Sequence, residues 1–236
     1  MTGEEVLTAD DGLPPRATWT VSWATGPAAA FHRRPVSTEL RRTVEVLQVD
    51  EPALVLGSTQ PESDADGDAL DAAGVALVRR RSGGGAVLLE PGGSTWVDVV
   101  IPHDDPLWAD DVGVAFHWLG RAWAGALRDL GVPAEVHEGP LLPSPWSRLV
   151  CFAGLGPGEV TVGGSKVVGI AQRRSRGGAR FQCALLHRWQ PEATVRLLSL
   201  DAADRRVATA ALAGAARGVA QPAATVVDAL LARLPG

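Results

Sequence analysis

Apolar residues form short runs along most of the chain between residues 44 and 186, either alternating with polar residues or following one another. Such runs, bounded by Gly, Pro and Asp, are typical of β-strands. The predicted strands are Val44–Val49, Pro52–Gly57, Val75–Arg79, Ala86–Leu89, Ser94–Ile101, Ala134–His137, Gly158–Val162, Lys166–Gln172 and Ala179–Leu186.

Helical spacing of the apolar residues occurs in three regions. A short helix is predicted at Asp68–Ala73, after a turn signal at Ser63–Gly67 and before Gly74. A longer helix is predicted to be capped by Asp110 or Asp111 and to end at Gly131, with apolar positions at Phe116, Leu119, Trp123, Leu127 and Leu130.

The third helical region is the tail that begins near Pro191. Its Ala- and Leu-rich stretch Leu197–Ala216 is interrupted at Asp201, and a second break follows at residues 218–222. The last predicted helix is Ala223–Leu234.

Most of the predicted strands come first, most of the helices come late, and one long helix lies in the centre. This order predicts an α+β fold with a mixed, largely antiparallel sheet and packed helices. The chain shows no βαβ alternation and no glycine fingerprint that leads from a first strand into a helix, so a Rossmann fold is disfavoured. Residues 18–236 are expected to form a single domain, and the polar, Pro-containing segment 1–17 is expected to be mobile.

The composition narrows the function classes. The chain is 46% apolar and 21% charged, as globular proteins are, and its net charge of −5 argues against nonspecific nucleic-acid binding. No apolar run reaches the roughly 18 residues of a membrane span, and the acidic N-terminus does not resemble a signal peptide. Two distant cysteines and the lack of a Cys/His cluster predict no disulfide framework and no metal site. A cytoplasmic location is expected.

One basic residue differs in kind from all the others. Lys166 is the only lysine, and the remaining 21 of the 22 basic side chains are arginine. A chain with this bias would keep a lysine where chemistry needs a compact ammonium whose pKa can be tuned, rather than a planar guanidinium. The alternative is a surface lysine that escaped the bias.

A glycine run follows three arginines in Arg79–Val87, which reads RRRSGGGAV. Glycines between two strands let backbone N–H groups approach an anionic ligand, and the arginines supply charge for a phosphate or carboxylate. The alternative is a hairpin turn beside a basic edge strand.

Cys151, in the apolar run 149–152, is a second candidate for chemistry. It is either an inert thiol on a buried strand or a nucleophile whose thiolate is favoured by a cation such as Lys166. Cys183 is predicted to be a core residue. The five histidines (His32, His103, His117, His137 and His187) form no nucleophile–base spacing, and the chain has no G-x-S-x-G or H-x-x-x-H motif.

Two of these motifs together resemble the lipoate–protein ligase family. Residues 80–87 are similar to its R-R-x-S-G-G-G-A-V element, and residues 163–172 are similar to its G-x-K-(I/V)-x-G-x-A-Q element, in the same order. The resemblance covers roughly residues 50–190 and implies the catalytic-domain fold of biotin and lipoate ligases. It implies catalytic roles for Lys166 and Cys151, and a substrate-binding set of Arg80, Arg81, Ser82, Gly83, Gly84, Gly85, Ala86, Val87, Leu88, Val168 and Gly169.

The family contains two chemistries, and both stay open at this stage. Cysteine-dependent transferases need no cofactor and pass an octanoyl or lipoyl group from a donor such as acyl carrier protein to a lysine of a lipoyl domain. The acceptor is of the dehydrogenase E2 or glycine cleavage H protein type. Ligases instead use ATP and Mg²⁺ to activate lipoate or octanoate. The first reading predicts a Cys151 thioester and an apolar tunnel near Val78, Val87 and Val168, whereas the second makes Cys151 a bystander. A third alternative is a non-catalytic acyl-binding module.

This chain departs from the family pattern at three places. Leu88–Leu89 replaces a usual histidine, Gln182–Cys183 replaces a His-Gly element, and Glu159 stands where aspartate is usual.

Overall fold

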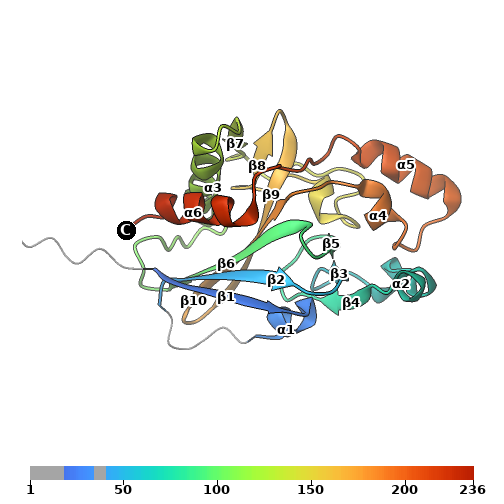
Figure 1. The fold of residues 1–236 in the computed structure, drawn as a ribbon, viewed down its shortest axis with the longest axis horizontal. Coiled ribbons are helices and arrows are strands. Elements are labelled where there is room, and N and C mark those ends of the chain that lie inside the picture. The colour runs from blue at the N-terminus through green and yellow to red at the C-terminus, as the bar shows by residue number, and fades with distance from the viewer. Residues whose placement is uncertain (1–18, 35–40) are drawn as a thin grey trace, which may run out of the picture.

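Two β-sheets that lie beside each other organise the chain in a computed structural model, which describes residues 19–34 and 41–236 (Figure 1). The segment 1–17, predicted to be mobile, lies outside the described residues. The larger sheet has the strand order β1-β2-β6-β10-β9-β8-β7, and the smaller sheet has the order β4-β3-β5. The strands are β1 Thr20–Gly26, β2 Thr43–Val49, β3 Ala53–Leu56, β4 Ala76–Arg79, β5 Val87–Leu89, β6 Ser94–Pro102, β7 Ala134–Val136, β8 Val160–Val162, β9 Ser165–Ser175 and β10 Gly178–Leu186.

Strand pairing is antiparallel except at β1–β2 and β3–β4, so the predicted mixed, largely antiparallel sheet is confirmed. The statement that the chain has no βαβ alternation is wrong, because a helix connects the two strands of each parallel pair. The first of these units was not predicted. β1 is a largely exposed edge strand, and burial therefore imposes little pattern on its sequence.

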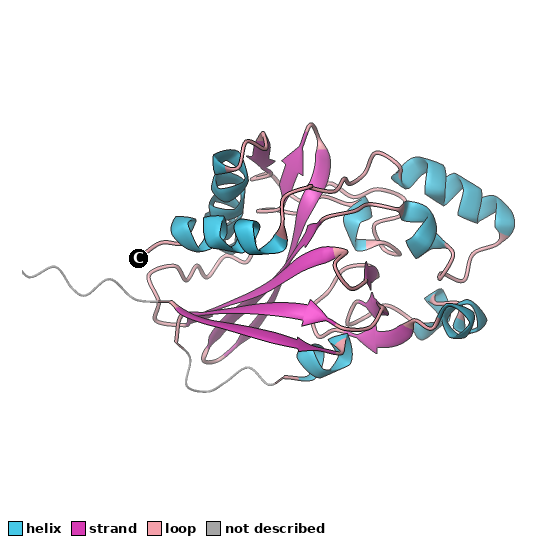
Figure 2. Cartoon of the chain, in the orientation of Figure 1, coloured by secondary structure: helices cyan, strands magenta, loops and turns pink. Residues whose placement is uncertain are grey.

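Helices cover both faces of the larger sheet (Figure 2). They are α1 Ala28–Arg33, α2 Gly67–Ala73, α3 His117–Asp129, α4 Pro191–Val195, α5 Ala202–Leu212 and α6 Ala223–Arg233, with short 3₁₀ turns at Glu62–Asp64, Val114–Phe116 and Cys151–Ala153. α3 and α6 pack against one face through a core that includes Val97 and Val99 of β6. Trp96 points to the other face and packs with α1 and the smaller sheet, as the two-residue repeat of a strand requires.

Aspartate side chains cap the N-termini of two helices, α2 and α5. The side chain of Asp66 accepts the N–H of Ala69 at the start of α2, and Gly74 ends this helix with a φ of +61°. α3 begins at His117 and not at the predicted cap, because Asp111 instead accepts the N–H groups of Gly113 and Val114 in the preceding turn.

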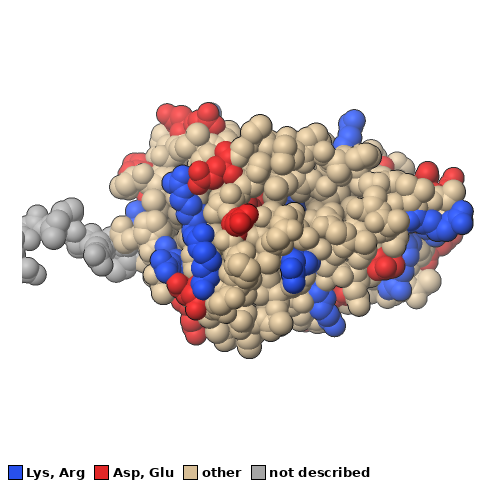
Figure 3. Space-filling view, turned by 90° about the horizontal axis from the view of Figure 1, so that it is seen from above, with Lys and Arg blue, Asp and Glu red and all other residues tan. Residues whose placement is uncertain are grey.

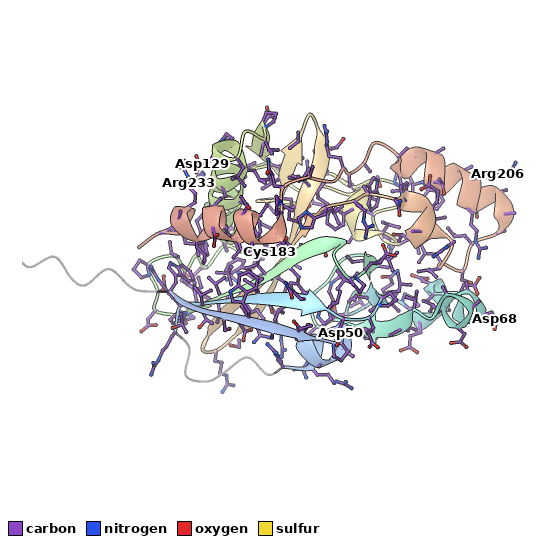
Figure 4. All side chains as sticks on the ribbon, in the orientation of Figure 1. Asp50, Asp68, Asp129, Cys183, Arg206 and Arg233 are labelled. Atoms are coloured by element: carbon purple, nitrogen blue, oxygen red, sulfur yellow. The ribbon has the colours of Figure 1, made fainter. Side chains whose placement is uncertain are left out.

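The ion pair between Asp129 and Arg233 joins the ends of α3 and α6, with Arg233 Nε donating to Asp129 Oδ2 over 2.6 Å (Figure 4). On the face seen in Figure 3, basic and acidic side chains lie near one another, and the described side chains there form no continuous basic surface. Within the described ranges, no helix has the length and apolar character needed to cross a membrane.

Candidate functional site

Lys166 is a buried residue at the start of β9, and only 2% of it is exposed. Its Nζ atom donates to Glu159 Oε2 over 2.8 Å and to the carbonyl oxygen of Cys151 over 2.9 Å. It also lies 5.0 Å from the centre of the Phe152 ring. The surface-lysine interpretation is therefore wrong. An ammonium has three N–H donors, and within the described chain the third has no hydrogen-bond acceptor.

Glu159 is the site residue that the sequence analysis did not select. Its Oε2 atom also accepts the N–H of Gly156, and its Oε1 atom accepts the N–H of Ile170. These bonds satisfy the buried carboxylate and fix where it holds the lysine. The sequence does offer a signal for Glu159, because it is an acidic residue seven positions before the only lysine. From the sequence alone, Glu159 is interpreted only as a difference from the family pattern.

The backbone of Lys166 is held by segments from both sides. Gly163 and Gly164, with φ values of +57° and +82°, form the tight turn that leads into β9. On the outer side, the N–H of Lys166 donates to the carbonyl of Ala215, and its own carbonyl accepts the N–H of Arg217. The segment that follows α5 therefore pairs with the start of β9 at the lysine, before the part of β9 that pairs with β10.

Cys151 begins a 3₁₀ turn, so the alternative of an inert thiol on a buried strand is wrong. The backbone before Cys151 pairs with the end of the glycine loop through a single β-bridge between Val150 and Ala86. In this bridge, the N–H of Ala86 donates to the carbonyl of Leu149, and the N–H of Cys151 donates to the carbonyl of Ala86. The chain then turns away at residues 151–153, which leaves the thiol partly exposed. Residues 65 positions apart in the sequence are brought together in this way.

The glycine loop is shaped by Arg80. This buried guanidinium donates to the carbonyl oxygens of Gly83, Gly85 and Val55 over distances of 2.7 to 3.2 Å. Its charge is thus directed into the loop, and its contacts in the structure hold the loop in position.

Two glycines of the loop lie close to the segment 149–151, which carries Cys151. A Cβ atom on Gly85 would lie 2.6 Å from the backbone nitrogen of Val150, so no larger residue fits without movement of the chain. Gly84 has a φ of +97°, and a Cβ atom there would lie 3.6 Å from the Sγ atom of Cys151. Among the described residues, the N–H groups of Gly84 and Gly85 have no hydrogen-bond acceptor.

An apolar pocket lies between the two sheets and reaches Cys151. Its walls are formed by His32, Val55, Arg80, Val87, Leu89, Trp96, Cys151, Phe152, Gly169, Ile170, Ala171, Gln182, Cys183 and Ala184. Small residues make the space, because Gly169 and Ala184 pair across β9 and β10 where larger side chains would fill it.

An open groove of about 350 Å³ lies on the other side of Cys151. Lys166, Glu159 and the three loop glycines, Gly83, Gly84 and Gly85, line this groove. Cys151 therefore lies at the boundary between an apolar pocket and a groove that also contains the charged side chains of Lys166 and Glu159.

The remaining predicted substrate-binding residues are distributed less compactly. Val87 lines the apolar pocket, but Val78 and Val168 do not. Val168 packs in the core on the opposite face, because side chains alternate along β9. Ala86 and Leu88 line a separate cavity near Trp189. Arg81 is exposed.

A hydrogen-bonded row of polar side chains borders the apolar pocket. Ser82 donates to Gln182 Oε1 over 3.1 Å, and Gln182 Nε2 lies 3.4 Å from His32 Nδ1. Burial lowers the pKa of His32 to about 4, with Arg80 and Arg180 acting in the same direction.

Asp98 lies in the same region and is 1% exposed. Burial raises its pKa to about 7, an effect that the guanidinium of Arg180 partly opposes. The Oδ1 atom of Asp98 accepts a hydrogen bond from the indole of Trp96.

Cys183 lies in the main core, as predicted, and burial raises the pKa of its thiol above the usual range. In the part of the chain that the structure describes, no three His, Cys, Asp or Glu side chains are grouped so that they could hold a metal ion.

The fold resembles those of lipoate ligases of known structure. A bipartite lipoate protein ligase from Thermoplasma acidophilum superimposes with a TM-score of 0.72, over 91% of this chain and 81% of the other, at 19% identity. Lipoate-protein ligase A bound with ATP superimposes with a TM-score of 0.69, over 91% and 83%, at 20% identity. These likenesses confirm the predicted fold.

Sequence relatives are also found among curated proteins. Octanoyltransferase LipM of Moorella thermoacetica is 35% identical over 133 residues, which cover 56% of this chain and 48% of the relative. LipM of Kyrpidia tusciae is 31% identical over 165 residues, or 68% and 60% of the two chains. The matched region is thus about half the length of these relatives.

The family model of the lipoyl protein ligase A/B catalytic domain matches residues 30–221, which include both motifs, Cys151 and Lys166. The chain belongs to the lipoyl protein ligase A/B catalytic domain family.

Proposed function

We propose that this protein transfers an octanoyl or lipoyl group to a lysine of a lipoyl-domain protein through a thioester on Cys151. The observation that carries the proposal is the position of Cys151 between the apolar pocket and the open groove that Lys166 lines. The names of the curated relatives, which are octanoyltransferases, support the same reaction.

The first half-reaction forms the acyl-enzyme. The thiolate of Cys151 attacks the carbonyl carbon of a donor thioester, such as an acylated acyl carrier protein, and the carbonyl oxygen becomes an oxyanion. Collapse of this intermediate breaks the donor C–S bond, and the donor leaves as a thiolate. The third N–H of Lys166 and the N–H groups of Gly84 and Gly85 are the groups available to stabilise the oxyanion.

The second half-reaction uses the open groove. The amine of the acceptor lysine attacks the thioester carbon, an amide bond forms and the C–S bond to Cys151 breaks. The proton lost by the amine balances the charge of the released thiolate. The groove on the polar side of Cys151 gives a lysine side chain a route that does not cross the acyl pocket.

The apolar pocket suits a saturated or dithiolane-bearing chain. Its walls are mostly aliphatic and aromatic, with His32, Gln182 and Arg80 as the polar exceptions. Burial of each methylene stabilises a bound chain by about 0.8 kcal/mol. An octanoyl group would therefore be held mainly by its chain, which leaves the carbonyl carbon at the mouth beside Cys151.

The alternative reaction is ATP-dependent ligation of lipoate, with Mg²⁺, through an acyl-adenylate. The SGGG loop resembles that of ligases, and the structural neighbour bound with ATP shares the fold. The transferase is favoured because the carbonyl groups of the loop already occupy most donors of Arg80, which limits what it can offer to phosphates.

We infer that the acceptor is a lipoyl domain of the dehydrogenase E2 or glycine cleavage H protein type. The archaeal neighbour was studied together with its E2 lipoyl domain, which supports this class of acceptor.

The test is intact-protein mass spectrometry after incubation with octanoyl-acyl carrier protein in the absence of ATP. The expected result is an octanoyl adduct that hydroxylamine removes and that the Cys151→Ala variant lacks. The acyl-enzyme should then pass its group to an added lipoyl domain. Absence of the adduct, together with lipoyl-domain acylation that requires lipoate, ATP and Mg²⁺ and persists in Cys151→Ser, would establish the ligase reaction instead.

A non-catalytic acyl-binding module is distinguished by the lysine. If Lys166→Arg bound octanoate as the wild type does, and neither protein acylated a lipoyl domain under either condition, the protein would be a binding module.

A further inference from the structure

Three arginines gather beside the glycine loop. Arg173 of β9 pairs in register with Arg180 of β10, so the two side chains lie on the same face of neighbouring strands. Burial lowers the pKa of Arg173, and the nearby charges of Arg81 and Arg180 lower it further. Positive charge is therefore concentrated here, although the whole chain has a net charge of −5.

The partners of these arginines differ. Arg180 lies 3.8 Å from Asp98. Within the described residues, Arg81 and Arg173 have neither a hydrogen bond nor an ion pair from their side chains.

Neighbouring arginines in the sequence are, by contrast, fully engaged. Arg79 donates to the carbonyls of Gly57 and Gln60 and pairs with Glu62. Arg174 donates to the carbonyls of Ala109 and Asp110. Since repulsion between Arg81 and Arg173 is not relieved by a carboxylate, an anion that bridged them would be favoured.

Their attachment places both arginines at the edge of the open groove. Arg81 is two residues before Gly83, which lines the groove, and Ser82 between them donates to Gln182 of β10. Arg173 lies on the same face of β9 as Ala171, which pairs with Gln182 and lines both the groove and the apolar pocket. The groove also contains Cys151 and Lys166. A donor whose acyl chain fills the apolar pocket and whose carbonyl meets Cys151 would leave its other end in this groove.

We propose that Arg81 and Arg173 bind the phosphate on the phosphopantetheine arm of the acyl carrier protein that the proposed function gives as the donor. This inference rests on the proposed transferase function. Guanidinium groups match the oxygens of a phosphate and bind it more strongly than neutral donors do. The phosphates of ATP offer the same chemistry, and the experiment separates the two sources.

The experiment compares S-octanoyl-4′-phosphopantetheine with S-octanoylpantetheine, which lacks the phosphate, as donors to Cys151. The acylation rate is followed by mass spectrometry for the wild type, Arg81→Gln and Arg173→Gln. Arg206→Gln is the matched control, because this exposed arginine lies on α5 at the periphery of the molecule (Figure 4), and no residue of α5 lines the groove.

We expect the wild type and the control to prefer the phosphorylated donor by about tenfold in kcat/KM. In the two site variants, Arg81→Gln and Arg173→Gln, the ratio of kcat/KM for the two donors should be close to one. Added salt should reduce the wild-type preference. A ratio that is the same in all four proteins would overturn the inference while leaving the transferase function intact. Acylation by neither donor, in any protein, would instead count against the proposed function.

Isothermal titration supplies the second arm. Tighter binding of 4′-phosphopantetheine than of pantetheine by the wild type, with the difference lost in Arg81→Gln and Arg173→Gln, supports the proposal. Loss of ATP binding in these two variants, with phosphopantetheine binding unchanged, would assign the arginines to a nucleotide and overturn the proposal.

Discussion

The Nζ atom of Lys166 lies 2.8 Å from the Oε2 atom of Glu159, and the two side chains are 3% and 8% exposed. Both charges are removed from water, and each depends on the other for compensation. The ammonium also fits between the carbonyl of Cys151 and the ring of Phe152. This enclosed position explains why a chain that otherwise uses only arginine keeps a lysine here.

Removal of the lysine should therefore destabilise the fold as well as stop the reaction. We expect Lys166→Met to lower the free energy of unfolding by about 3 kcal/mol, because it leaves the Glu159 carboxylate buried without a countercharge. The double variant Lys166→Met/Glu159→Gln should lose less than the sum of the two single variants. Urea denaturation of the four proteins measures this coupling, and additive losses would show that the pair is not energetically linked.

The glycine loop should tolerate a methyl group at one position and not at another. We expect Gly85→Ala to lower the free energy of unfolding by about 1–3 kcal/mol and to abolish acylation, because the added Cβ would push on the backbone of Val150 next to Cys151. Urea denaturation and the mass-spectrometric acylation assay measure the two effects.

Gly83→Ala is the matched control, since a Cβ atom there meets nothing within 4 Å. Its unfolding free energy should stay within about 0.5 kcal/mol of the wild type. If the two alanine variants behaved alike, the close approach of the loop to Val150 would not be what positions Cys151.

The strands from β2 to β10 were predicted from the sequence because each has an apolar run bounded by turn residues. That Lys166 is the only lysine was equally clear from the sequence, since it needs only a count of the basic residues. For Cys151 the sequence left two alternatives open, because its apolar neighbours fit a buried strand and nothing local reveals that the pairing ends after a single bridge between Ala86 and Val150.

Long-range contacts explain the other differences. Glu159 is defined as a site residue by its bond to Lys166 across the β8–β9 turn, and Arg80 by carbonyls that only the folded loop brings together. β1 is exposed at the sheet edge, so its sequence carries little imprint of burial. The properties that could not be predicted are therefore those that depend on tertiary contacts rather than on local pattern.

The two cysteines should react at different rates with a thiol reagent. Cys151 is partly exposed in the groove, whereas Cys183 lies in the core of β10, where burial raises its pKa (Figure 4). We expect iodoacetamide to add one label to the folded protein and two in denaturant, as counted by mass spectrometry. The Cys151→Ala variant should take up no label until it is unfolded. Labelling of Cys183 in the folded variant would contradict its assignment to the core.

Asp98 and His32 should affect stability in opposite directions as the pH changes. The raised pKa of Asp98, about 7, means that the folded protein holds a proton that the unfolded chain has released above about pH 4. Its contribution is present at low pH and is lost as the pH rises towards 7. The lowered pKa of His32, about 4, has the reverse effect, because its contribution is present above about pH 6.5 and is lost on acidification.

Single substitutions should separate these two contributions. The stability of Asp98→Asn minus that of the wild type should be larger at about pH 8 than at about pH 5. At the higher pH the wild type carries a buried carboxylate charge, which the variant does not have. For His32→Asn the difference in stability from the wild type should instead be most favourable to the variant at about pH 5. At that pH the imidazole is protonated in the unfolded wild type but uncharged in the folded one, which lowers the stability of the wild type. Urea midpoints at the two pH values test both expectations. Parallel stability curves for all three proteins would mean that neither group titrates differently in the folded and unfolded chains.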